Sequence, residues 1–512
     1  MSPTRRIQLA ITIIPIYSRM YKNRLYISLI TILLCLSTTL SAQPRLTVVV
    51  VVDGMTQDNL TALRPYWSAG GLRLMSEEAF QTTATFPHQV YGGQETMATL
   101  MTGTTPNNHG IMSDAYYDRS DRETQIRTIL FDKKVSGIGT TTQISPRSII
   151  STTITDEWRM MHGTSSKIYA IGLHPQATVL MAGHAANACC WLDSATQKWV
   201  TTSFYPEGLP TAADNMNISG RINTLIAGDW KPRMNIEQYP MPAGENNKTE
   251  FSYHYKDVLL QSPIANSMVI ELALNLQQQQ KLGKDQSPDL LLLQLNTLSP
   301  SAESDIITTI EQTDLYMGIN QDLGFFIDHL NKHIGRDNYQ MLIVGRPVKG
   351  HSLENMRMAN IPIKHFNLDR AAALTGAYLM AIHGHERWIE GAYGPFIYLN
   401  RMLIEKKGLS LETFERQVAN FLMEFEGIQV AYPIHEAMIS AERVSVYRKH
   451  SGDVYFRLLE NWLLDTNEEQ GFDSVIQARP VVPVLYWSHA ATTFPTEKME
   501  ATAIKSLISP MK

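Results

Sequence analysis

An aspartate at the end of an apolar run is the first residue of this sequence placed to hold a ligand or a metal ion. Asp53 follows the uninterrupted run Val48–Val52 and precedes Gly54. A short run of β-branched residues is typical of a strand buried on both faces of a parallel sheet, and ligands bind where such strands end. Asp53 therefore lies at the expected edge, although an Asp-Gly pair also forms turns without any further role.

Histidines occur in two pairs whose spacing is found in metal sites. His329 and His333 are four residues apart, whereas His383 and His385 flank a single glycine. The first spacing places both rings on one face of a helix, but no carboxylate in the spacing of a zinc protease accompanies them. Two ligands alone make a weak zinc site. We therefore interpret the first pair as part of a solvated helix face and the second as loop residues.

The adjacent cysteines Cys189 and Cys190 are the remaining reactive pair after the first 42 residues. A disulfide between chain neighbours requires a strained ring. We expect two small, buried, unoxidised thiols.

The elements that must position these residues alternate between strands and helices. Two amphipathic patterns, at residues 313–330 and 411–425, are typical of helices. Alternation over this length predicts an α/β fold built on a doubly wound, mostly parallel sheet. Apolar runs like Val48–Val52 predict further strands at Leu290–Leu295, Met341–Val344 and Val482–Trp487.

Residues 1–42 have the organisation of a secretory signal peptide. Two basic residues precede the apolar run Leu25–Leu36, and small residues follow it. This run is shorter than the roughly 20 residues that span a bilayer. We expect export to the periplasm or outside the cell and no membrane span after signal cleavage, with residues 43–512 as the mature chain. Met20 is an alternative start, and Cys35 an alternative lipid attachment site that lacks small neighbours.

The charge balance excludes one class of partner. The chain has 44 basic and 49 acidic residues, and the leader contributes five basic residues and no acidic one. Its removal leaves an acidic mature chain without the basic surface that nucleic acids require. We expect no nucleic-acid partner.

One motif, TGTTPNNHGI at residues 102–111, resembles the alkaline phosphatase superfamily. The resemblance is to secreted bacterial alkaline phosphatases with a threonine nucleophile, which are related to type I phosphodiesterases and nucleotide pyrophosphatases. It runs from about residue 45 to about residue 490 and implies a mostly parallel central sheet flanked by helices, with an inserted cap region. Further matching segments are Ser145–Ser148, Thr152–Glu157, Ala182–His184, Asp289–Leu291, Asp322–Gly324 and Tyr398–Arg401.

The resemblance implies a definite chemistry. In that family two zinc ions bind the attacking and leaving oxygens of a phosphoryl displacement, and each needs about three Asp or His ligands. A threonine at a helix start attacks, and polar groups hold the other phosphate oxygens. Asp53 is the one ligand position retained here. Elsewhere the matching positions hold Gly93 for the nucleophile, Ser299, Glu303, Arg346, Pro347 and Val481 for ligands, and His174, Gln176 and Asp114 for phosphate contacts.

Arg346 suggests how the carboxylate of Asp53 could be neutralised without a metal ion. A fixed cation that replaces an acidic ligand beside Asp53 can form an Arg–carboxylate ion pair, which would replace the metal electrostatically. Asp114 in place of a phosphate-binding asparagine would repel phosphate. Two shifted nucleophiles have simpler interpretations: Thr96 as an ordinary helix-start threonine and Thr85 as a chance match. His184 resembles a retained structural residue of the family.

We therefore predict a secreted, catalytically degenerate member of the superfamily, a pseudoenzyme with a binding or assembly role in the cell envelope. No cofactor is expected, and the partner would be an envelope protein or a small ligand such as a carbohydrate or peptide. The alternative is an active, zinc-dependent phosphomonoesterase or phosphodiesterase with a rearranged site. The candidate cleft residues are Asp53, Glu95, Asp114, Glu303 and Arg346.

Overall fold

The computed structural model describes most of the chain after the predicted signal peptide. The chain divides into two units, Met1–Pro44 and Arg45–Lys512, and residues 1–42 lie outside the described part. The described residues are 43–120, 125–240, 250–300, 309–348, 360–439, 444–459, 461–465, 480–488 and 498–508. No helix within these ranges is long and apolar enough to cross a bilayer.

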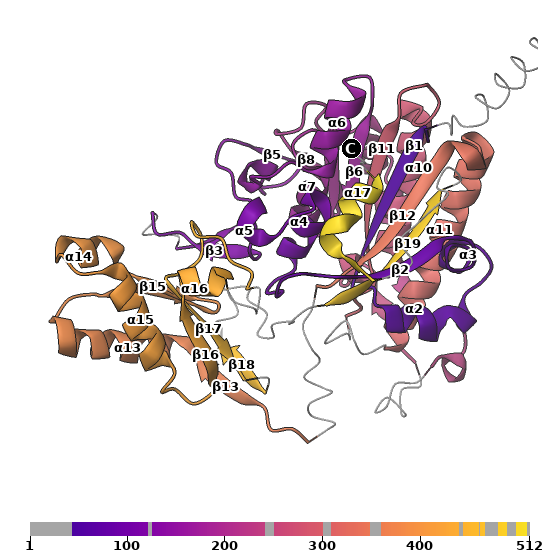
Figure 1. Cartoon of the computed structure of the whole chain (residues 1–512). Coiled ribbons are helices and arrows are strands. Elements are labelled where there is room, and N and C mark those ends of the chain that lie inside the picture. The colour runs from indigo at the N-terminus through magenta and orange to yellow at the C-terminus, as the bar shows by residue number, and fades with distance from the viewer. Residues whose placement is uncertain are drawn as a thin grey trace, which may run out of the picture. The chain divides into compact units, whose positions relative to one another are not determined.

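A ten-stranded sheet forms the centre of the second unit (Figure 1). Its five middle strands, β12, β1, β11, β6 and β7, run parallel, and antiparallel strands extend it on both sides. The predicted doubly wound α/β architecture is confirmed. In spatial order the strands are β20 (Met499–Glu500), β2 (Phe80–Thr85), β19 (Val481–Ser488), β12 (Tyr339–Arg346), β1 (Leu46–Asp53), β11 (Asp289–Asn296), β6 (Ile168–Gly172), β7 (Ala188–Asp193), β8 (Lys198–Thr202) and β5 (Gly137–Ile138).

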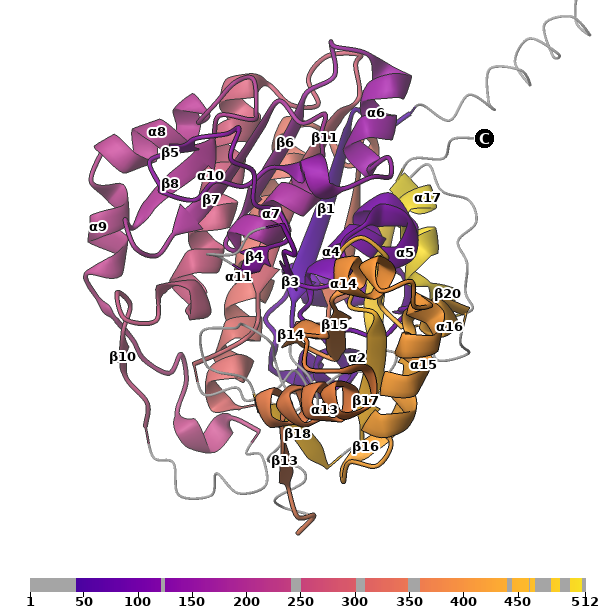
Figure 2. The same cartoon turned by 90° about the vertical axis from the view of Figure 1, so that its left-hand side faces the viewer.

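Helices cover both faces of this sheet (Figure 2). The valines of β1 alternate between two cores, because successive side chains of a strand point to opposite faces. Val48, Val50 and Val52 pack with one set of helices, and Val49 and Val51 with the other. The first set is α2 (Gln57–Leu63), α3 (Gly71–Glu78), α8 (Thr211–Ile218), α9 (Arg221–Ile226), α10 (Pro263–Gln280) and α11 (Ile310–His333); the second is α4 (Gln94–Thr102), α6 (Ile154–His162), α7 (Pro175–Ala182) and α17 (Ile504–Ile508).

The chain between β12 and β19 forms a separate small sheet, which we call the cap after the inserted region that the family resemblance implies. Its four strands lie in the order β14-β15-β17-β16. Tyr91, Met112 and Tyr117 from the first part of the chain pack into its core. The cap elements are β13 (Lys364–Asn367), α13 (Leu368–His383), β14 (Ile389–Tyr393), β15 (Phe396–Leu399), α14 (Arg401–Lys406), α15 (Leu411–Leu422), β16 (Ile428–Pro433), α16 (Ile434–Ile439), β17 (Val454–Leu458) and β18 (Trp462–Asp465).

The predicted elements and thiols agree with the structure, with two differences. Both amphipathic patterns form helices, α11 and α15, although α15 ends at Leu422 rather than Phe425. Cys189 and Cys190 are buried free thiols on β7, and burial raises the pKa of Cys190 to about 12. His383 is the last residue of α13 rather than part of a loop, and its Nε2 lies 2.8 Å from Oε1 of Gln417.

Candidate functional site

The register of three neighbouring strands brings Asp53 and Arg346 together. Asp53 is the last residue of β1 and lies opposite Asn296 of β11 and Arg346 of β12. Since all three strands are parallel, their carboxyl ends share one edge of the sheet. Asp53 and the cationic residue Arg346 are therefore direct neighbours on adjacent strands.

Arg346 and Asp53 form a two-point ion pair. Nε of Arg346 donates to Oδ1 of Asp53 at 2.6 Å, and Nη2 donates to Oδ2 at 2.5 Å. Only 1% of Arg346 and 5% of Asp53 are exposed. Fork-to-fork pairing of this kind is the strongest arginine–carboxylate geometry, and the ion pair hypothesised from the sequence is present.

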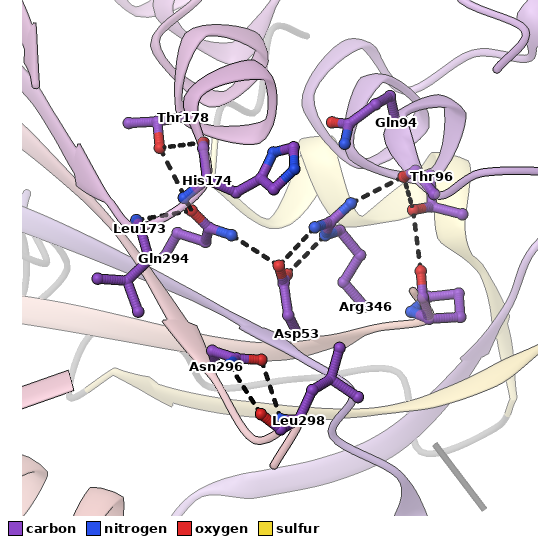
Figure 3. A network of polar contacts seen from close by, with 12 residues as sticks. Asp53, Gln94, Thr96, Leu173, His174, Thr178, Gln294, Asn296, Leu298 and Arg346 are labelled. Carbon is purple, nitrogen blue, oxygen red and sulfur yellow. Dashed lines mark hydrogen bonds and ion pairs between the residues drawn. The ribbon is translucent and has the colours of Figure 1, made fainter. Parts of the chain in front are cut away.

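Two further groups complete the network around this pair (Figure 3). Nη1 of Arg346 donates to the carbonyl of Gly93 at 2.8 Å, and Nε2 of Gln294 donates to Oδ2 of Asp53 at 2.6 Å. Oε1 of Gln294 accepts the backbone N–H groups of Leu173 and His174 at 3.0 and 2.9 Å. Gln294 was not identified from the sequence, although it is a polar residue inside the otherwise apolar run of β11.

Gly93 adopts a backbone conformation that excludes most side chains. Its φ of 105° is left-handed, where glycine is favoured because it has no Cβ. A Cβ built there would lie 3.5 Å from Nη1 of Arg346. The side chain that the family resemblance assigns to this position would therefore point at the guanidinium.

Glu95 and Asp114 hold the start of α4 instead of facing a cleft. The Glu95 carboxylate accepts the backbone N–H of Tyr91, and those of Gly92 and Gly93 at 3.1 Å each. Burial raises the pKa of Glu95, against these hydrogen bonds. Oδ1 of Asp114 accepts the N–H of Gln94 at 3.1 Å. The expectation that Glu95 is a cleft residue is therefore wrong: a fully buried carboxylate bonded to backbone is not offered to a ligand.

Asp114 also changes the electrostatics at this helix terminus. The N-terminus of a helix favours anions, and the Asp114 carboxylate already occupies that position on α4. A Cβ on Gly92 would lie 2.7 Å from Cγ of Asp114, so glycine is required for this approach. A phosphate at the same position would meet a negative charge.

The shifted nucleophiles and the histidine pairs have structural roles. Thr96 is fully buried, and its hydroxyl donates to the carbonyl of Gly93, as expected of a helix-start threonine. Thr85 ends β2. His329 is half-buried on α11, with Nε2 3.0 Å from Oε1 of Gln277. Nδ1 of His184 lies 2.8 Å from Oδ2 of Asp156, and this bond raises the pKa of His184.

The described residues do not fit a zinc pair. Both Asp53 oxygens bond Arg346, so a cation already occupies the position beside the retained carboxylate. No group of three or more His, Cys, Asp or Glu side chains suited to a metal occurs in the described ranges. Ser299 bonds the hydroxyl of Thr309 at 3.1 Å, and Glu303 lies outside the described residues.

His174 and Gln94 are further polar side chains near the pair. His174 is solvent-exposed, yet the protein around it and the positive charge of Arg346 lower its pKa to about 4. The imidazole is therefore neutral near pH 7. Gln94 is only 2% exposed, and its Oε1 has no hydrogen-bond partner.

Comparison with known proteins identifies relatives over most of the chain. The profile of the type I phosphodiesterase / nucleotide pyrophosphatase family matches residues 47–472. Alkaline phosphatase PafA of Elizabethkingia meningoseptica is 25% identical over 395 residues, which are 72% of this chain and 71% of that protein. Alkaline phosphatase PhoV of Synechococcus elongatus is 26% identical over 59% of this chain and 58% of its own length.

Solved structures show the same fold. The crystal structure of wild-type alkaline phosphatase PafA has a TM-score of 0.77 at 22% identity and covers 92% of this chain and 96% of its own. Phosphonoacetate hydrolase from Sinorhizobium meliloti has a TM-score of 0.52 at 13% identity, with 91% and 96% covered. The sheet, the helical layers and the cap are thus a shared scaffold.

Proposed function

The chain belongs to the type I phosphodiesterase / nucleotide pyrophosphatase family, and on that premise we propose that it is a member without catalytic activity that binds a ligand or partner in the cell envelope. The observation that carries this proposal is the buried ion pair between Asp53 and Arg346. Relatives named alkaline phosphatases match the sequence, and the structure of one of them has the same fold. The residues at this sheet edge are what would separate this chain from them.

The electrostatics of the pair support a site that needs no metal. A buried carboxylate without a partner is strongly unfavourable, and Arg346 supplies the partner permanently. A zinc ion beside Asp53 would have to displace the guanidinium, which also donates to Gly93. Loss of the metal ions and of the nucleophile would raise the activation free energy of phosphoryl transfer. Each tenfold loss in rate corresponds to about 1.4 kcal/mol of activation free energy.

The test is the zinc content of the purified chain from residue 43 onward, together with its turnover of p-nitrophenyl phosphate and bis-p-nitrophenyl phosphate. We expect elemental analysis after mild dialysis to find almost no zinc, and turnover equal to the buffer blank. Asp53→Asn is the matched control, because it removes the one retained ligand position: any activity that it leaves unchanged comes from a contaminant. Near two zinc ions per chain, with activity that Asp53→Asn abolishes, would instead establish the metal-dependent phosphohydrolase.

The envelope location is part of the same proposal. It rests on the signal-peptide pattern of residues 1–42. The mass of the chain recovered from the cell envelope should correspond to cleavage after Ala42. An uncleaved chain in the cytoplasm would contradict the location without affecting the argument about catalysis.

A further inference from the structure

A cavity of about 40 Å³ lies between helices α3 and α11, over the start of β12. The two helices pack against each other, and the cavity remains where their side chains and the sheet do not fill the space between them. Its apolar wall is formed by Leu74 and Met75 of α3, Ile327 of α11 and Met341 of β12.

This cavity is far from the Asp53–Arg346 pair. Tyr339 lines it and begins β12, whereas Arg346 ends the same strand. A strand rises about 3.3 Å per residue, so roughly 23 Å separate the two ends. A ligand in the cavity would therefore lie at the opposite edge of the sheet from the ion pair.

Two residues of opposite charge lie where the cavity meets an outer hollow of about 300 Å³. Glu78 and Arg336 line both spaces, together with Trp487. Glu78 is the last residue of α3, and Arg336 lies in the turn between α11 and β12. Nη2 of Arg336 donates to Oε2 of Glu78, so the pair connects the two walls of the opening.

The Glu78–Arg336 pair is available to a ligand. The side chains of Arg336 and Glu78 are 55% and 39% exposed. An ion pair this exposed contributes little to stability. Both groups can therefore exchange each other for charges of a ligand at small cost.

Aromatic side chains position the arginine. The guanidinium carbon of Arg336 lies 5.7 Å from the centroid of the Trp487 ring. The rings of Trp487 and Tyr339 are 4.8 Å apart between centroids, and the Tyr339 hydroxyl donates to Oδ1 of Asn331 on α11 at 2.9 Å. An arginine supported by a ring in this way loses less conformational freedom when it binds an anion.

The cavity selects a short apolar group by its size and lining. A volume of about 40 Å³ has room for roughly three water molecules, and a short branched alkyl group such as the side chain of leucine occupies a similar volume. Met75 and Met341 are flexible, so the wall can adapt to such a group. Transfer of the alkyl group from water to this wall is favourable.

The charges at the opening select a zwitterion. Arg336 can bind a carboxylate, and Glu78 can bind an ammonium group, which the C-terminus of α3 also favours. An anion without an ammonium group would meet the carboxylates of Glu78 and of Asp337, which lines the outer hollow. An amine without a carboxylate would meet the cation of Arg336.

We propose that this cavity binds a free apolar α-amino acid of about the size of leucine. The side chain of the ligand occupies the space between α3 and α11. Its carboxylate accepts hydrogen bonds from Arg336, and its ammonium group donates to Glu78. The site goes beyond the proposed function and does not depend on it, because it lies at the other edge of the sheet.

The test is isothermal titration calorimetry of the purified chain from residue 43 onward with leucine and four probes. 4-Methylpentanoate lacks the ammonium group, 3-methylbutylamine lacks the carboxylate, and N-acetylleucine amide lacks both charges. Aspartate has both backbone charges but a polar side chain. We expect leucine to bind and each probe to bind at least tenfold more weakly, as the loss of a charge-assisted hydrogen bond or of apolar burial requires.

Substitutions at the opening test the same assignment. Arg336→Gln and Glu78→Gln should each weaken leucine binding at least tenfold. Glu77→Gln is the matched control and should leave binding unchanged. Glu77 is the neighbouring carboxylate of α3, is 44% exposed and pairs with Arg73 at 3.1 Å, but it lines neither the cavity nor the hollow.

Leu74→Phe tests the cavity itself, because it keeps both charges and fills the apolar space; it should abolish binding. Circular dichroism melts show whether each variant is folded, and the two exposed charge substitutions still test the proposal if Leu74→Phe does not fold. The proposal is overturned if leucine does not bind, if Arg336→Gln and Glu78→Gln bind it as the wild type does, or if any probe binds as tightly as leucine. Zinc content and phosphatase turnover leave these outcomes unaffected.

Discussion

At the scale of residues, the buried ion pair between Asp53 and Arg346 defines this site. Arg346 ends β12 beside Asp53 and contacts both carboxylate oxygens with almost no solvent exposure. A buried ion pair contributes little net stability compared with an apolar pair, but removal of one partner leaves an isolated buried charge. Single substitutions in the pair should therefore lower the free energy of unfolding more than the double substitution does.

Arg346→Met should lower the free energy of unfolding by about 3–5 kcal/mol, because Asp53 loses its cation while it remains buried. Arg346→Lys should lie between the wild type and Arg346→Met, since an ammonium keeps the charge but cannot reproduce the two parallel bonds. The double variant Asp53→Leu with Arg346→Met should recover much of the loss. Urea unfolding measures the wild type, these three variants and Asp53→Leu alone. A double variant as unstable as the sum of Asp53→Leu and Arg346→Met would contradict the ion-pair account.

Gly93 makes a second prediction at the same scale. Gly93→Thr introduces the family's nucleophile type, but its Cβ lies 3.5 Å from Nη1 of Arg346 and its backbone stays at a φ of 105°. We expect a loss of about 1–2 kcal/mol in the free energy of unfolding and no gain of phosphatase turnover. Turnover in this variant above that of the wild type would show that a missing hydroxyl is the main defect.

Sequence alone predicted this site unevenly, for physical reasons. Asp53 and Arg346 both end apolar strand runs, so their meeting follows from parallel register. Gln294 and Gln94 belong to no motif. Only the three-dimensional packing shows that the Gln294 side chain is hydrogen-bonded, whereas Oε1 of Gln94 is not. Glu95 was assigned to the cleft because sequence does not show whether a carboxylate folds back onto its own backbone.

At the scale of elements, a hydrogen-bond network of His88, Thr99 and His109 stabilises helix α4. Nδ1 of His109 accepts the N–H of Ile111 at 3.1 Å, so its Nε2 carries the proton and donates to Thr99. The Thr99 hydroxyl then donates to Nε2 of His88 at 2.7 Å, and Nδ1 of His88 donates to the carbonyl of Gln89. Both rings are neutral in this arrangement, and each nitrogen has a partner.

This network predicts a loss of stability in acid. Burial lowers the pKa of His88 from 6.5 to about 4, so the unfolded chain binds a proton at a higher pH than the folded chain. The contribution of neutral His88 to the free energy of unfolding is therefore complete above pH 6.5. It falls by about 3 kcal/mol in total as the pH falls from 6.5 to about 4. His88→Leu should make this part of a urea-unfolding profile against pH less steep but not flat, because burial also lowers the pKa of His109. Exposed His333→Ala should leave the slope unchanged. An equal slope in wild type and His88→Leu would contradict the assignment.

Helix α11 contains a buried glutamine whose side chain makes no hydrogen bond within the described chain. Gln312 is fully buried, and neither atom of its amide group has a partner in the described chain. Gln312→Leu should raise the free energy of unfolding by about 1 kcal/mol, because it removes unsatisfied polar atoms. Gln277→Leu is the control, since Nε2 of Gln277 donates to the carbonyl of Leu282 at 2.9 Å; it should destabilise the protein. A loss of stability in Gln312→Leu would mean that the amide has a partner after all.

At the scale of the whole molecule, one carboxylate joins the cap to the chain that precedes it. Asp453 is fully buried next to β17 and accepts hydrogen bonds from Arg119, Arg401 and the N–H of Leu399, at 2.5, 2.5 and 2.6 Å. Arg119 lies far earlier in the sequence and also donates to Glu390 on β14 at 2.7 Å. The cap sheet and the segment around Arg119 should therefore unfold together.

Asp453→Ala should lower the free energy of unfolding by about 3–5 kcal/mol, because two arginines lose their shared carboxylate and the N–H of Leu399 loses its acceptor. Lys364→Ala is the control: its ion pair with Glu426 is exposed and contributes at most about 1 kcal/mol. Calorimetry and limited proteolysis should show one shared transition in the wild type, and early cleavage of the cap in Asp453→Ala alone. The shared transition follows from the cap core, which includes Tyr91, Met112 and Tyr117, so a cap that melts separately in the wild type would show that these contacts do not couple it to the sheet.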